Sequence, residues 1–159
     1  RNCKFTEVNL SHRAFLECEF YDCDFAGSKL GDTAFKDVKF IRCKLLGVDF
    51  ANCNPFLLEM NFDECLMNLT SFYKLQLKGT TFNKCSLVEA DFVEADLLAV
   101  KFLECDLAQA QFDQSNLEKS DFRTAINYSL NPNNNRLNGA KFSRSGVTGL
   151  LDEFNLIIE

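Results

Sequence analysis

The sequence predicts an all-β solenoid, a chain wound into stacked coils with four sides each. Three observations predict it: a large apolar residue recurs at every fifth position, a small residue recurs two positions before it, and six of the eight cysteines recur at intervals of 20 or 22 residues. A period of five fits neither the α-helix, which repeats near 3.6 residues, nor the strand, which repeats at 2. A chain that turns at every fifth residue must coil.

The large positions form two long runs. From Phe5 to Phe50 every fifth residue is Phe or Leu, ten in a row, and from Leu57 to Phe122 fourteen more follow the rule, with Met67 as the one variation. These 24 positions hold 14 of the 17 phenylalanines, a concentration typical of repeat architectures. Between the two runs the register slips by two residues, within residues 51–56.

The residue two before each large one is mostly Cys, Val, Ser, Thr or Ala. Two positions apart on extended backbone point the same way, so each unit sends one large and one small side chain inward. The other three residues turn the corner and face water. An interior filled in this way leaves no channel or pocket, and we expect none.

The cysteines give the length of one coil. Spacings of 20 residues, and one of 22 across the slip, place six thiols in one column if four units make a coil: Cys3, Cys23, Cys43, Cys65, Cys85 and Cys105. Coils stacked like strands lie ~4.8 Å apart. There is no Cys-x-x-Cys pair and His12 is the only histidine, so we expect no metal site and no cofactor. Free thiols in such number suit a reducing compartment, which predicts a cytoplasmic protein.

The chain divides into a solenoid over residues 1–145, of about seven coils, and a C-terminal segment over residues 146–159. Val147, Leu150, Leu151 and Phe154 have the i, i+3, i+4, i+7 spacing of one helix face. An open solenoid end needs a cap, so this short helix either caps the coil or also pairs two chains. The second reading predicts a homodimer through four residues: Leu150, Leu151, Phe154 and Ile157.

Acidic residues concentrate in one stretch of the repeat. Residues 87–118 carry eight acids and one base, Lys101, a net charge of −7 in a chain of −6. Such residues either form an ordinary solvated surface or imitate duplex phosphates toward a basic groove. The candidate partner-binding residues are Glu89, Asp91, Glu94, Asp96, Glu104, Asp106 and Asp113, with Glu118 at the end of the stretch. An acidic surface argues against direct nucleic-acid binding, and no apolar run is long enough for a membrane span.

The repeat units "ADFVE" and "ADLLA" at residues 90–99 resemble those of the pentapeptide repeat proteins. The resemblance covers nearly all of the chain and implies a right-handed, quadrilateral β-helix. "FRTAINYSL" at 122–130 and "AKFSRSGVTGLL" at 140–151 resemble the ending of gyrase-protecting members, which implies the C-terminal dimer. Several quinolone-resistance members carry long loops between coils, whereas this chain has only the two-residue interruption at Asn54 and Pro55.

Catalysis fits the sequence poorly. There is no glycine-rich phosphate loop and no nucleophile elbow, and the carboxylates lie on convex corners. Two binding functions remain. The resemblance implies a DNA mimic that engages DNA gyrase or another type II topoisomerase and confers tolerance to gyrase poisons such as quinolones or albicidin. The alternative is a rigid spacer or interaction module that contacts an unknown partner through outward apolar residues: Ile41, Leu46, Leu98 and Leu103.

Overall fold

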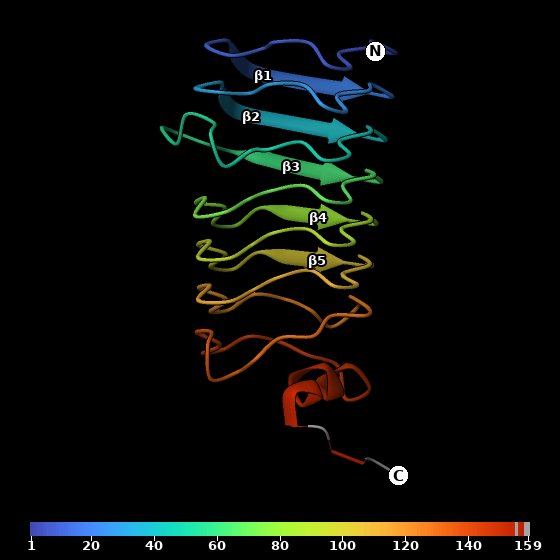
Figure 1. The fold of residues 1–159 in the computed structure, drawn as a ribbon, viewed down its shortest axis with the longest axis vertical. Helices are drawn as coiled ribbons and strands as arrows, with labels where there is room; N and C mark the ends of the chain where they lie inside the picture. The colour runs from blue at the N-terminus through green and yellow to red at the C-terminus, as the bar shows by residue number, and fades with distance from the viewer. Residues whose placement is uncertain (155, 158–159) are drawn as a thin grey trace.

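The computed structural model describes residues 1–154, 156 and 157, and they form an all-β solenoid. Five parallel strands build one sheet in chain order: β1 (Ala14–Tyr21), β2 (Ala34–Ile41), β3 (Met60–Asp63), β4 (Thr81–Asn83) and β5 (Lys101–Leu103). Figure 1 shows these strands stacked along the long axis of a rod, with the two termini at opposite ends. Within the described residues, no helix has the length and apolar character that crossing a membrane requires.

Residues 20 positions apart pair in parallel register, as in Ala14↔Ala34 and Phe82↔Phe102. Single bridges at the same spacing continue the pairing around the other three sides of the coil. In chain order the sides are the sheet side (β3 to β5 and the ends of β1 and β2), the Leu66 side (Lys44, Leu66, Ser86, Asp106), the Asp91 side (Asp49, Ser71, Asp91, Gln111) and the Asp96 side (Gln76, Asp96, Asn116). The predicted four units per coil are confirmed by this register.

Most corners are turned by residues with left-handed backbone, two positions after a large residue. Glu89, Glu94 and Glu104 have φ values of 57°, 56° and 51°. Only a few per cent of non-glycine residues adopt positive φ, so each corner carries a local cost. The corner amides offset it with hydrogen bonds to the next coil: Glu89 N donates to Ala108 O at 2.8 Å, and Glu94 N to Asp113 O at 2.8 Å.

The register changes to 22 residues between β2 and β3, where Val38 pairs with Met60. The additional residues lie in a loop that projects from the stack between these strands (Figure 1). The prediction that Leu57 fills the core is wrong: it is exposed, and its φ of 56° makes it a corner residue. The two extra residues move the corner onto Leu57, and Leu58 packs against the core in its place.

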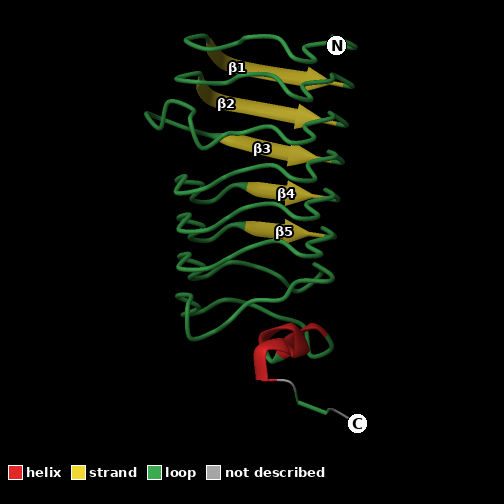
Figure 2. Ribbon diagram, in the orientation of Figure 1, coloured by secondary structure: helices red, strands yellow, loops and turns green. Residues whose placement is uncertain are grey.

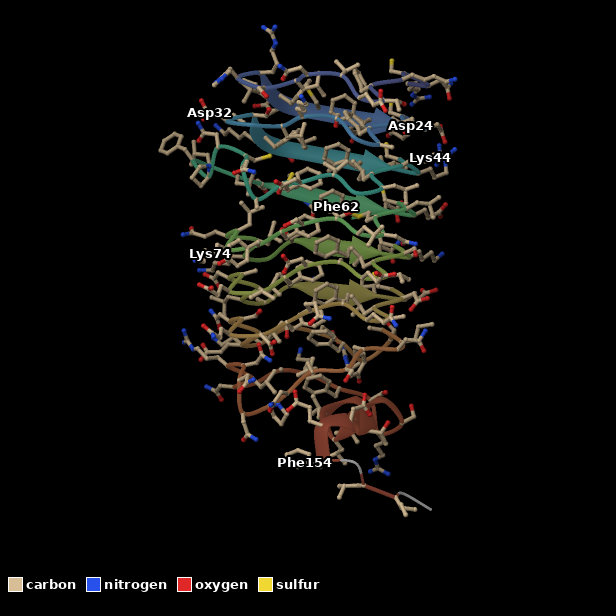
Figure 3. All side chains as sticks on the ribbon, viewed as in Figure 1. Asp24, Asp32, Lys44, Phe62, Lys74 and Phe154 are labelled. Atoms are coloured by element: carbon tan, nitrogen blue, oxygen red, sulfur yellow. The ribbon has the colours of Figure 1, made fainter. Side chains whose placement is uncertain are left out.

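Two facing columns of phenylalanine fill the interior. On the sheet side, Phe82 stacks on Phe62 and Phe102 with ring centroids 5.1 and 5.3 Å apart, and on the Asp91 side Phe72 stacks on Phe92 at 5.0 Å. The columns meet edge to face, as between Phe82 and Phe92, at 5.9 Å and 82°. Both arrangements suit the charge distribution of aromatic rings. Figure 3 shows Phe62 in this interior.

The cysteine column lies beside these rings as free thiols, buried from Cys23 to Cys105. Cys65 Sγ donates to Phe40 O at 3.3 Å, and Cys105 Sγ donates to Phe82 O at 3.4 Å. Hydrogen bonds with the thiols of Cys105 and Cys65, together with burial, raise the pKa of Cys85 far above its ordinary range. The thiols from Cys23 to Cys105 are buried beneath the corners, where reagents do not reach them, so we assign this column a packing role.

Near the C-terminus the columns continue through Phe142, whose ring stacks on Phe122 at 5.3 Å. The single predicted helix is wrong, because two short 3-10 helices follow: η1 (Gly146–Leu150) and η2 (Asp152–Phe154), shown in Figure 2. Gly146 and Gly149 are poor helix formers. Their missing side chains instead make room for Tyr128, and Leu150 packs against the core.

Gly149→Ala is expected to detach this C-terminal segment from the solenoid. A Cβ at Gly149 would lie 2.2 Å from the backbone oxygen of Tyr128, a clash that backbone movement must relieve at a cost of roughly 1–3 kcal/mol or more. Hydrogen exchange of the Leu130 amide, which donates to Gly149 O at 3.0 Å, should accelerate. Gly31→Ala is the control, since its Cβ would meet only Ser11 Oγ at 3.4 Å. Unchanged exchange in Gly149→Ala would contradict the packing described.

Candidate interaction surface

The seven acidic residues proposed as a partner-binding face fall into two groups. Five lie at or next to the Asp91 side: Glu89, Asp91, Asp113 and Glu94 on this side and its two corners, and Asp96 at the start of the adjoining Asp96 side. Glu104 and Asp106 lie at the corner where the sheet side meets the Leu66 side, because Asp106 follows Leu66 and Ser86 in one bridge column. The acidic stretch therefore forms a belt around the rod, with most of its carboxylates toward the Asp91 side.

Three aspartates of this set are half-buried and stabilise turns of the backbone. Asp91 Oδ1 accepts from Val93 N at 2.9 Å, and Asp96 Oδ1 accepts from Leu98 N at 3.2 Å. Asp106 Oδ1 accepts a similar bond from Ala108 N at 3.1 Å. Such contacts are typical of Asx turns. These carboxylates stabilise the turns of the solenoid. Their negative charge still contributes to the electrostatic potential at the surface.

The exposed members are the glutamates at the corners and Asp113. Glu94 is partly neutralised, because Lys74 Nζ lies 3.3 Å from its carboxylate and Tyr73 Oη donates to it at 3.1 Å. Figure 3 shows Lys74 at the edge of the rod. Among the residues that the structure describes, Glu89, Glu104 and Asp113 form no ion pair. They carry the unpaired negative charge of the belt.

Glu118, at the end of the acidic stretch, is half-buried and pairs with Arg136 at 2.9 Å. A surface ion pair of this kind contributes about 0–1 kcal/mol to stability. Its main consequence is local neutralisation, so the unpaired charge of the belt ends before this residue.

The apolar residues that are exposed in the structure differ from those predicted from the sequence. Ile41, Leu98 and Leu103 are only half-exposed, whereas Leu46 is exposed. The sequence reasoning missed Leu66, exposed on the Leu66 side, and Leu69, exposed at its corner with the Asp91 side. The signal was present at Leu66: it occupies the outward position just before Met67, where neighbouring coils have Lys44 and Ser86.

The C-terminal residues proposed for a dimer divide by exposure. Leu150 is half-buried against the chain's own core, and Leu151 is also half-buried. Phe154 and Ile157 are exposed. Figure 3 shows Phe154 at the C-terminal end of the rod. The two exposed side chains are the ones free to contact a second molecule.

The hollows on the surface are open to solvent, and the one with a histidine holds it exposed. One of about 590 Å³ lies near the N-terminal end and is lined by residues such as His12, Lys29 and Asp49. His12 Nδ1 lies 3.2 Å from Asp32 Oδ2, but both side chains are exposed to solvent. Within residues 1–154, 156 and 157, no group of three or more potential metal ligands comes together.

A filled parallel solenoid with these features belongs to the class of elongated repeat proteins. Proteins of this class use their extended outer surface for binding. More narrowly, the chain belongs to the pentapeptide repeat family: the family model described as "Pentapeptide repeat region" matches residues 14–92 and 59–149. The resemblance read from the repeat units is confirmed. No curated protein sequence gives a significant match.

A solved structure shows the same fold. Trypsin-treated QnrB1, a plasmid-mediated fluoroquinolone resistance protein, is similar over 99% of this chain and 86% of that one, with 17% identity and a TM-score of 0.66. The pentapeptide repeat protein Rfr23 from the cyanobacterium Cyanothece 51142 is 15% identical over 86% of this chain and 88% of that one, with a TM-score of 0.45. At these identities the likeness to QnrB1 establishes the fold alone.

Proposed function

We propose that the protein is a non-enzymatic, cytoplasmic DNA mimic that binds DNA gyrase or a related type II topoisomerase and confers tolerance to gyrase poisons. The observation that carries the proposal is the belt of unpaired carboxylates on a rigid rod, led by Glu89, Glu104 and Asp113. The fold shared with QnrB1, a fluoroquinolone resistance protein, supports the choice of partner.

The rod would imitate a DNA duplex in its electrostatic field and its overall shape. Coils repeat at ~4.8 Å, whereas phosphates repeat at about 3.4 Å along one strand of a duplex, so the two do not match atom for atom. Glu94 and Asp113 lie on successive coils, joined by a backbone hydrogen bond of 2.8 Å, and bring carboxylates to one side of the rod. A basic DNA-binding groove attracts such a side over long range, and salt weakens the attraction.

The proposed functional form is a rod of seven right-handed coils, closed by the 3-10 segment and paired into a homodimer through Phe154 and Ile157, with Leu150 and Leu151 beneath them. Exposed apolar side chains at the end of a solenoid favour such pairing. Light scattering should give the mass of a dimer for the wild type and of a monomer for Phe154→Asp. A monomeric wild type would exclude the dimer.

A gyrase supercoiling assay at two salt concentrations, with and without a quinolone, tests the function. The wild type should inhibit supercoiling or relieve poisoning, and more salt should weaken the effect. Changing Glu89, Glu94 and Asp113 together to lysine should reduce potency by about tenfold or more, since a tenfold loss needs only ~1.4 kcal/mol over three charge reversals.

The matched control changes three corner glutamates of the N-terminal half, Glu7, Glu17 and Glu64, to lysine. It alters the net charge equally and leaves the acidic stretch intact, so potency should stay close to that of the wild type. A wild type that neither inhibits supercoiling nor relieves poisoning at low salt would refute the proposal.

The second candidate function, a rigid interaction module for another partner, is favoured by one observation. Leu46 and Leu66 are exposed on the Leu66 side, and Leu69 is exposed at its corner with the Asp91 side, one coil from Glu89. A contiguous exposed apolar patch is typical of a protein contact.

A further inference from the structure

We propose that the Leu66 side is a docking site for a cationic amphipathic helix of a partner protein. The leucine patch, Leu46, Leu66 and Leu69, would anchor the apolar face of the helix. Glu89, Glu104 and Asp106 would attract its basic residues. The inference does not rest on the gyrase proposal, because Leu46 and Leu66 lie outside the Asp91 side and its corners.

The leucine patch spans two neighbouring coils, with Asn68 between Leu66 and Leu69. Leu45 N donates to Leu66 O at 2.7 Å, and Gly47 N donates to Asn68 O at 2.9 Å, so Leu46 lies between two backbone contacts with the segment that carries Leu66 and Leu69. The three leucine residues are 41%, 46% and 60% exposed. Single exposed leucines are ordinary, whereas three on one side and its corner form a surface that binding would remove from water.

Leu69 is costly to the fold in two ways. Its φ of 60° is left-handed, a conformation in which bulky apolar residues are rare, and its side chain gains little burial. Gly47 occupies the equivalent corner one coil earlier, and a Cβ there would meet no atom within 4 Å. Gly47 therefore offers Leu69 no side chain to pack against. Folding does not explain a leucine at this corner, whereas a contact with a partner does.

The acidic rim lies one to two coils beyond the leucine patch, with Lys84 at the corner one coil before Glu104. Leu69 N donates to Val88 O at 2.9 Å, which places Glu89 one coil from Leu69. Asp106 lies two coils from Leu66 in the same bridge column, through Ser86. Within the described part of the chain, Glu89 and Glu104 form no ion pair, so their charge is available to a ligand.

The spacing between the leucine patch and the acidic rim defines which partner helix would fit. Two coils span about 10 Å, which equals roughly six to seven residues of α-helix at 1.5 Å each. A helix laid along the rod would place apolar residues at i, i+3 and i+4 on the leucine patch and Lys or Arg near i+7 and i+11 on the rim. The acidic rim disfavours nucleic acids and anionic membranes, which carry the same sign of charge.

A labelled synthetic peptide tests the site by fluorescence anisotropy. The probe is an 18-residue helix with Leu at i, i+3 and i+4 and Lys at i+7 and i+11, compared with a scrambled peptide of the same composition. Leu66→Asp and Leu69→Asn should each weaken binding by about tenfold, as expected when a central apolar anchor is lost. Asparagine suits left-handed backbone, so Leu69→Asn should keep the fold intact, as checked by thermal unfolding.

The matched control is Leu16→Asp, since Leu16 is 56% exposed and lies outside the leucine patch. It should bind the peptide like the wild type. Glu89→Lys with Glu104→Lys should weaken binding and flatten its salt dependence, whereas Glu7→Lys with Glu17→Lys should do neither. Equal binding of the ordered and scrambled peptides, equal binding by wild type and Leu69→Asn, or no binding at all would overturn the proposal.

The two proposals fail separately. The peptide assay contains no topoisomerase, so its outcome is independent of gyrase. Leu69→Asn leaves the carboxylates unchanged and should retain any effect on supercoiling.

Discussion

Phe82→Ala is expected to destabilise the solenoid by about 3–5 kcal/mol, a large part of the ~5–15 kcal/mol that holds a domain together. The ring is buried and stacks between Phe62 and Phe102, with centroids 5.1 and 5.3 Å away. It also meets Phe72 and Phe92 edge to face at 5.7 and 5.9 Å. Rigid coils above and below cannot collapse into the space, so a cavity remains.

Chemical denaturation followed by circular dichroism measures this loss. Phe56→Ala is the matched control, because Phe56 is 74% exposed on the loop between β2 and β3. Its replacement should change the free energy of unfolding by no more than about 0.5 kcal/mol. Similar losses in the two variants would show that the stacked rings do not form the core.

Val100→Asp is expected to cost at least about 3–5 kcal/mol at neutral pH, or to prevent folding, because it buries a charge without a partner. Val100 is buried at the inward position two residues before Phe102. Hydroxyl groups are accepted at such inward positions: Ser120 Oγ donates to Leu117 O at 2.6 Å, in the equivalent place one coil later. Val100→Thr can make the same bond to Leu97 O and is the mild control.

The pH dependence of Val100→Asp separates charge from size. Burial raises the pKa of a carboxyl group, so the folded protein disfavours the charged form. The penalty is complete above the folded-state pKa and is relieved as the pH falls through that value toward the unfolded value near 3.9. Unfolding midpoints relative to the wild type should therefore recover on acidification. A constant difference between pH 7 and pH 4 would attribute the loss to shape alone.

The regular part of the fold was predictable because each coil obeys one local rule. Phe and Leu at every fifth position, with cysteines 20 apart, give both the coil length and the facing columns of rings. The slip shows the limit of this reasoning. Counting residues shows that two are added, but not which residue turns the corner, and that choice exposes Leu57 and brings Leu58 inward.

The structure of the C-terminal segment and the arrangement of the acidic residues depend on contacts that the residue spacing in the sequence does not predict. The apolar pattern from Val147 to Phe154 predicts a helix, yet the room that Tyr128 needs beside Gly146 and Gly149 favours two 3-10 turns. The acidic stretch is continuous in sequence, but winding distributes it around the rod. Hydrogen bonds then engage Asp91 in a turn, while Glu89 stays exposed at a corner.

The central claim is that twenty residues complete one coil, so that residues 20 apart lie in contact, and 22 apart across the slip. Nuclear Overhauser effects between side chains test it most directly. The ring of Phe82 should show cross-peaks to Phe62 and Phe102, and Val38 should show them to Met60. Absence of the cross-peaks from Phe82 to both Phe62 and Phe102 would contradict the coil, and with it the placement of every surface residue described above.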